Sequence, residues 1–234
     1  MPFFIIGTLG LLIFLAWATF QTARMLRVIK VEQNLLLMPA ENVLRVVLIA
    51  ICFGLAWVSG QPPENFGLVF RDSLRDTMIG MMVGVVCALA LPVLTRLAIE
   101  RFGRKIYSPV VVLSVLPRER GEWFALPSAL AFAVLLEEFL FRALLLGGFA
   151  EFAPPLVLAL VWSVLFGAMH SPQGVFGMTI AAALGFLFSM LFLYTASLLA
   201  PLLAHYVINL LQIVWASRDK TWLENYDTDP GSHL

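Results

Sequence analysis

Seven long runs of apolar residues divide this chain, and they limit the folds that it can adopt. A helix that crosses a bilayer needs about 20 mostly apolar residues. The runs cover residues 2–20, 43–60, 78–98, 124–147, 154–170, 174–194 and 197–216. Of the 234 residues, 61% are hydrophobic and 13% are charged, against about 45–50% apolar and about 25% charged in soluble domains. The sequence therefore predicts an all-α, polytopic bundle of seven transmembrane helices.

A further apolar stretch, YSPVVVLSVLP, runs from Tyr107 to Pro117 and is too short to cross a bilayer by itself. We interpret it as an interfacial or re-entrant segment; the alternative is that it forms part of an eighth span. On the sixth run, Gly177, Ala181 and Gly185 are spaced by four residues. This spacing of small residues indicates close helix packing rather than chemistry.

Lysine and arginine are concentrated in alternate connections between the runs, and such an excess marks the cytoplasmic side. The basic residues of these connections are Arg24, Arg27, Lys30, Arg45, Arg96, Arg101, Arg104, Lys105, Arg118 and Arg120. Arg218 and Lys220 follow the last run, whereas the connections near 148–153 and 195–197 have no basic residue. With seven spans, this distribution predicts an N-terminus outside and a C-terminus in the cytoplasm. The net charge is zero, so nothing suggests nucleic-acid binding.

A few polar groups lie inside the later apolar runs, where they are energetically expensive and therefore candidates for function. They are Glu137, Glu138, Arg142, His170, His205 and the uncharged Asn209. Glu138 and Arg142 are at positions i and i+4 of a helix, so we expect them to pair. Glu137 is rotated by about 100° from Glu138, so it can face a cavity. One negative charge is left over, and a proton, a cationic histidine or water must offset it.

These residue types are suited to the hydrolysis of an amide bond. A carboxylate and an imidazole can activate a water molecule as general bases. A second imidazole and an amide N–H can stabilise the oxyanion that develops, and His205 and Asn209 share one helix face at i and i+4. No serine or cysteine nucleophile stands at helical spacing from these groups. A zinc site made of two histidines and a glutamate is the alternative, although the spacing differs from H-E-x-x-H.

Three short motifs resemble the type II CAAX prenyl endopeptidase family, also called the CPBP or Abi family. EEFLFR (137–142) resembles its EExxxR motif, FGAMH (166–170) its FxxxH motif and HYVIN (205–209) its HxxxN motif. Order and spacing agree over roughly residues 124–216. One departure is Ala143, where many members have glycine; because alanine is also small, we expect little consequence.

The resemblance implies a glutamate-type intramembrane endopeptidase without a metal or other cofactor. It implies that Glu137 and His170 activate water and that His205 and Asn209 form the oxyanion hole. Glu138, Arg142 and Phe166 would then support the site. It also divides the chain into a scaffold of helices and a basic loop (1–120), a catalytic core (121–216) and a polar tail (217–234), which we expect to be unstructured from Glu224.

The implied partners are the lipid bilayer and a membrane-associated peptide or protein substrate, lipidated or not. A short chain of this kind fits a prokaryotic inner membrane. The alternative function is non-hydrolytic: a bacteriocin-immunity-type binder or a proton-coupled transporter. A transporter would favour inverted repeats with broken helices in both halves, and the sequence shows no such symmetry. The three motifs can form one site only if they lie close together in the fold. We therefore predict a cavity between them that opens on the cytoplasmic side and not beside residues 148–153.

Overall fold

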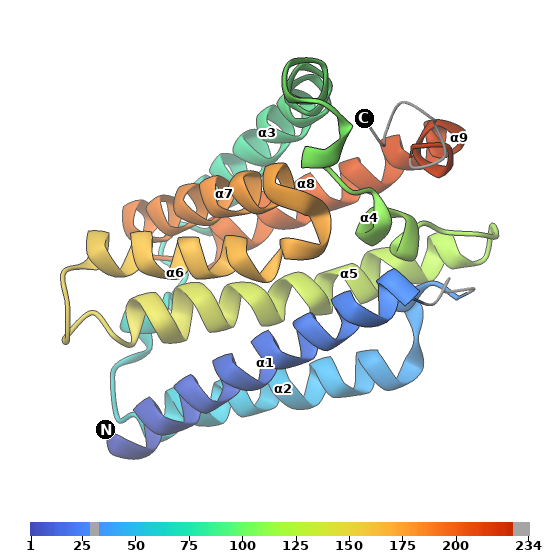
Figure 1. Ribbon diagram of the computed structural model, residues 1–234. Coiled ribbons are helices and arrows are strands. Elements are labelled where there is room, and N and C mark those ends of the chain that lie inside the picture. Colours follow the sequence, from blue (N-terminus) through green and yellow to red (C-terminus); the bar gives the residue numbers. More distant parts are fainter. Residues whose placement is uncertain (29–32, 227–234) are drawn as a thin grey trace.

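The computed structural model describes residues 1–28 and 33–226, and every regular element in this part of the chain is helical. The predicted all-α bundle is confirmed, and Figure 1 shows the long helices lying side by side. The α-helices are α1 (Pro2–Val28), α2 (Pro39–Val58), α3 (Ser73–Phe102), α4 (Val110–Val115), α5 (Glu122–Glu138), α6 (Pro155–Met169), α7 (Gly174–Thr195), α8 (Leu199–Arg218) and α9 (Lys220–Glu224). The shorter or wider turns are η1 (Leu35–Leu37), η2 (Pro63–Phe66), η3 (Arg104–Ile106), the π-helix η4 (Phe139–Gly147) and η5 (Ser171–Gln173).

Five of the described helices are long and apolar enough to cross a membrane: α1, α2, α3, α7 and α8. Large apolar side chains such as Phe3, Trp57 and Phe124 project outward from the bundle, as lipid-facing residues do. The chain is an integral membrane protein. The other two predicted spans are also helical, as α5 continued by η4 and as α6. α6 has 15 residues, about 22 Å of helix, which is shorter than the ~30 Å hydrocarbon core.

Two helices begin four or five residues earlier than the apolar runs predict. α2 begins at Pro39, because proline fits the first turn of a helix, and Arg45 is therefore a helical residue and not part of a connection. α3 begins at Ser73, where the side chain of Asp72 accepts a hydrogen bond from the Arg75 backbone N–H at 3.1 Å. Helix starts follow such caps, and hydropathy does not detect them.

The stretch from Tyr107 to Pro117 contains the six-residue helix α4. Six residues extend about 9 Å, so α4 cannot form an eighth span. It contacts η1, η5, α8 and α9 at one end of the bundle. The backbone N–H of Ser108 donates to the carbonyl of Gln173 at 3.0 Å, which attaches this segment to the turn after α6.

The helices pack in a defined order. α1 contacts α2, α2 contacts α5, and α5 contacts α8, while α6 and α7 pair on η4 and α3 packs along α8. Figure 1 shows α5 crossing the middle of the bundle, with α1 and α2 on one side and α7, α8 and α3 on the other. The largest apolar cluster joins buried residues of α1, α2 and η4. The EEFLFR motif therefore lies at the centre of the molecule.

Glycines allow close contact within two helix pairs. A Cβ atom at Gly167 would lie 2.6 Å from the Met178 carbonyl oxygen, so α6 and α7 pack backbone to backbone there. Gly80 has the same function between α3 and α8. Of the predicted small-residue stripe, Gly185 faces Phe166 on α6 and Ala181 is buried. A Cβ atom at Gly177 would instead contact Gln173, at the start of its own helix.

The C-terminal segment folds back on the bundle as far as it is described. Tyr226 is buried, its hydroxyl donates to the Arg104 carbonyl at 2.9 Å, and its ring contacts Tyr107. Burial raises the pKa of the Tyr107 phenol to about 12. The expectation of an unstructured end is therefore wrong for Glu224–Tyr226, because Tyr226 supplies an apolar ring that can be buried. Lys30 and the remaining tail, 227–234, lie outside the described residues.

Candidate active site

The two adjacent glutamates at the end of α5 have opposite environments. The Glu138 side chain is 0% exposed, whereas the Glu137 side chain is 41% exposed. Successive helical residues differ by about 100° in direction, so one side chain enters the packed bundle and the other leaves it. The π-helix η4 starts at the next residue, Phe139, and such wide turns are rare and often found at functional sites.

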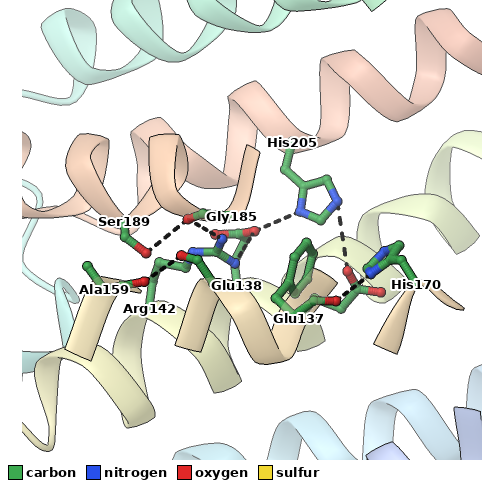
Figure 2. A network of polar contacts seen from close by, with 10 residues as sticks. Glu137, Glu138, Arg142, Ala159, His170, Gly185, Ser189 and His205 are labelled. Carbon is green, nitrogen blue, oxygen red and sulfur yellow. Dashed lines mark hydrogen bonds and ion pairs between the residues drawn. The ribbon is translucent and has the colours of Figure 1, made fainter. Parts of the chain in front are cut away.

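Glu138 is the centre of a buried polar network, shown in Figure 2. Its Oε1 accepts a hydrogen bond from Arg142 Nη1 at 3.0 Å, which confirms the predicted pair. The same oxygen lies 2.7 Å from Nδ1 of His205 on α8. Arg142 also donates from Nη2 to the Gly185 carbonyl on α7 at 2.9 Å. One carboxylate oxygen therefore links α5, η4 and α8, and Arg142 extends the network to α7.

Two phenylalanines surround this network. Arg142 lies over the rings of Phe166 and Phe188 at 5.1 and 5.3 Å, within the range of a cation–π contact. Phe188 also stacks on His205 at 5.0 Å, and Phe166 contacts both His170 and His205. The two rings therefore contact the guanidinium and pack against both imidazoles. The sequence pointed to Phe166 and gave no signal for Phe188, which belongs to no motif.

His170 ends α6. Its Nδ1 lies 2.7 Å from the Phe166 carbonyl oxygen, one turn earlier, so Nδ1 carries the proton that is donated there. The chain then turns at Gly174, whose φ of +81° favours glycine and where a Cβ atom would lie 2.5 Å from the Ile106 carbonyl oxygen. The Nε2 atom of His170 is left for other partners.

A cavity of about 570 Å³ lies beside these groups. It is lined by the second half of α1, the first half of α2, η1, α4, the end of α5, and the turn after α6. Glu137 and His170 both line it, and Figure 2 shows their side chains in the same region. No lining residue belongs to 148–153, so the cavity lies at the lysine- and arginine-rich end of the bundle. The orientation of that end in the membrane stays a prediction.

The structure brings three of the four proposed catalytic residues together. His205 Nε2 lies 3.8 Å from Glu137 Oε2, and Glu137 shares the cavity with His170. Asn209 is half-buried on α8, one turn after His205, and does not line the cavity. Its role in an oxyanion hole stays a prediction.

The cavity also contains charged residues that the motifs do not include. Glu41 and Arg45 from α2 line the same space as Glu137. The sequence assigned Arg45 to a connection, and its i, i+4 spacing from Glu41 was the only local signal. In the described part of the chain, no group of three or more histidine, cysteine, aspartate or glutamate side chains is arranged to hold a metal ion.

Comparison with known proteins agrees with the motifs. Residues 119–211 match the family model described as "Type II CAAX prenyl endopeptidase Rce1-like". This match confirms the family resemblance and includes every predicted site residue from Glu137 to Asn209. No curated protein and no solved structure matches the chain.

Proposed function

We propose that this chain, whose residues 119–211 belong to the type II CAAX prenyl endopeptidase Rce1-like family, hydrolyses a peptide bond of a membrane-associated substrate by means of a water molecule. One observation supports this most strongly. Glu137 is exposed to the cavity that His170 also lines, although its neighbour Glu138 is fully buried in an ion pair. A carboxylate left accessible inside a membrane bundle is available for proton transfer.

Glu137 and His170 would activate the water. Because His170 donates its Nδ1 proton to the Phe166 carbonyl, its Nε2 lone pair can accept a hydrogen bond from water. The water oxygen attacks the carbonyl carbon while its proton passes to the Glu137 carboxylate. The same proton is then delivered to the amide nitrogen as the C–N bond breaks. A positioned general base of this kind contributes about 10²–10⁴-fold to the rate.

His205 would stabilise the oxyanion. Glu138 accepts the proton on Nδ1, so only Nε2 of His205 can face the reaction, and it lies near Glu137. A His205 that carries both protons donates an N–H there and adds a second positive charge. In that proposed state, Arg142 and His205 would balance the charges of Glu137 and Glu138. Asn209 is the proposed second donor.

The proposed mechanism uses no metal. Purified protein should keep its peptidase activity, within about twofold, after incubation with EDTA or 1,10-phenanthroline and buffer exchange, because Glu137 and His170 would activate water by proton transfer alone. Metal analysis of the same sample gives the matching control. Stoichiometric zinc, with activity lost on its removal and restored on its return, would favour the zinc alternative.

A test of the function itself starts in cells. The membrane peptides of cells that express wild type are compared by mass spectrometry with those of cells that express Glu137→Ala. We expect longer, uncleaved forms of a small set of membrane-associated peptides to accumulate in the variant. A phenotype of Glu137→Ala without any change in peptide length would instead favour a non-hydrolytic binder or transporter.

The proposed substrate reaches the site from one side. The cavity lies where α1 ends and α2 begins, and this end has the connections rich in lysine and arginine. By the charge distribution it faces the cytoplasm, with the N-terminus outside and the C-terminus inside. We propose that the protein resides in a prokaryotic inner membrane and takes membrane-associated, optionally lipidated, peptides from the cytoplasmic side.

A further inference from the structure

Arg45 is a cation in the cavity that the proposed mechanism does not use. It lies in the second turn of α2, outside the segment that matches the family, and it lines the cavity together with Glu137 and His170. Most of the other lining side chains are apolar, from α1, α2 and α5. A charged group in such surroundings is costly unless an opposite charge or hydrogen bonds compensate it.

The hydrogen bonds of Arg45 hold only one edge of its guanidinium. Nη1 donates to the Leu36 carbonyl and to Asn42 Oδ1, both at 3.1 Å. Within residues 1–28 and 33–226, Nε and Nη2 have no hydrogen-bond partner. The head group is therefore anchored through one nitrogen, and its other N–H groups remain for a ligand.

The acidic residues near Arg45 do not form an ion pair with it in the described structure. Glu41 and Glu137 are near enough to act on the guanidinium, yet neither forms an ion pair with it within 4.0 Å in the described structure. Arginine is suited to bind a carboxylate through two parallel N–H···O bonds. An anion that enters the cavity would find this donor set unoccupied by protein acceptors.

We propose that Arg45 binds a carboxylate of the substrate and thereby holds the peptide with its scissile bond at Glu137 and His170. The proposal rests on the proposed peptidase function and adds a substrate class to it: peptides with an anionic group close to the cleaved bond. A cavity of about 570 Å³ is of the size that holds a small ligand, so the carboxylate lies within a few residues of the scissile bond. It comes from the chain terminus or from an acidic side chain.

The test uses purified full-length protein and randomised peptide libraries, with cleavage read by mass spectrometry. One library ends in a free carboxylate and a matched one ends in an amide; in each, internal Glu and Asp are present or replaced by Gln and Asn. We expect wild type to favour carboxylate-bearing peptides by about 10- to 100-fold in kcat/KM, the range of a charge-assisted hydrogen bond. The library in which the preference disappears identifies the source of the carboxylate.

Variants assign the preference to Arg45. Arg45→Gln should abolish it chiefly by raising KM for the carboxylate peptides, and Arg45→Lys should keep part of it. Arg75→Gln is the matched control, because Arg75 is exposed and does not line the cavity. A preference that survives in Arg45→Gln, or a wild type that cuts acids and amides equally, would overturn the inference. If Arg45→Gln does not fold, the acid-to-amide ratio of wild type and Arg45→Lys decides.

Failure of the peptidase function has a different result. In that case no peptide is cut in a Glu137-dependent manner, and the same libraries are used for binding to immobilised wild type and Arg45→Gln. Arg45-dependent retention of the carboxylate peptides then still supports the anion site, and equal retention of acids and amides rejects it.

Discussion

Replacement of Glu137 by glutamine is expected to reduce kcat for peptide cleavage by about 10²–10⁴-fold, the contribution of a general base. Glutamine keeps the shape of the side chain but cannot accept the proton of water. Stability should change little, because the side chain is 41% exposed and its nearest ion-pairing partner, His205, is 3.8 Å away. The measurements are single-turnover cleavage and thermal unfolding of the purified protein in detergent.

Glu41→Gln is the control for this result. Glu41 is a second carboxylate that lines the same cavity, so it tests whether any loss of negative charge there has the same effect. We expect it to retain near-wild-type kcat. A fully active Glu137→Gln protein would rule out the glutamate mechanism, and an equal loss in both variants would mean that Glu137 acts only through its charge.

Glu138→Gln should behave differently, because it destabilises the fold as well as the site. The substitution leaves the Arg142 guanidinium, 1% exposed, without its anionic partner and replaces the carboxylate that accepts from His205 Nδ1 by a neutral, weaker amide acceptor. Removing one partner of a buried ion pair lowers the free energy of unfolding by about 3–5 kcal/mol. We therefore expect a lower unfolding temperature and lower expression, together with lost activity as His205 loses its orientation.

The matched control is an ion pair on the surface. Arg96 and Asp219 lie 3.4 Å apart with side chains 69% and 55% exposed, and such pairs contribute about 0–1 kcal/mol. Arg96→Gln should therefore unfold close to the wild-type temperature under the same conditions. A Glu138→Gln protein as stable as Arg96→Gln would contradict the structural role given to the buried network.

The sequence predicted those features that depend on short-range helical geometry. Glu138 and Arg142 stand four residues apart, and the pair is present. The different directions of Glu137 and Glu138 follow from adjacent positions on one helix, and the short length of the Tyr107–Pro117 stretch favoured an interfacial or re-entrant segment over part of an eighth span. The membrane class followed from the apolar runs, since their length matches the bilayer.

Features that depend on contacts between distant segments could not be predicted in the same way. The link between Glu138 and His205 joins residues 67 positions apart, and the spacing within each motif does not determine it. For the same reason, the sequence provided no signal for Phe188 and assigned Arg45 to a connection between helices. The sequence did not predict the π-helix η4. Hydropathy shows which residues are apolar, but it does not show which backbone carbonyl accepts a hydrogen bond from each N–H group.

The composite wall of the cavity has a consequence for how such a protein can diversify. The proposed hydrolytic groups come from residues 137–209, but much of the space in front of Glu137 and His170 is bounded by α1 and α2, which lie outside the segment that matches the family. Mutations in those two helices can reshape what fits without touching the groups that would break the bond. A chimaera that keeps residues 119–211 and exchanges the first two helices is therefore a direct route to altered selectivity.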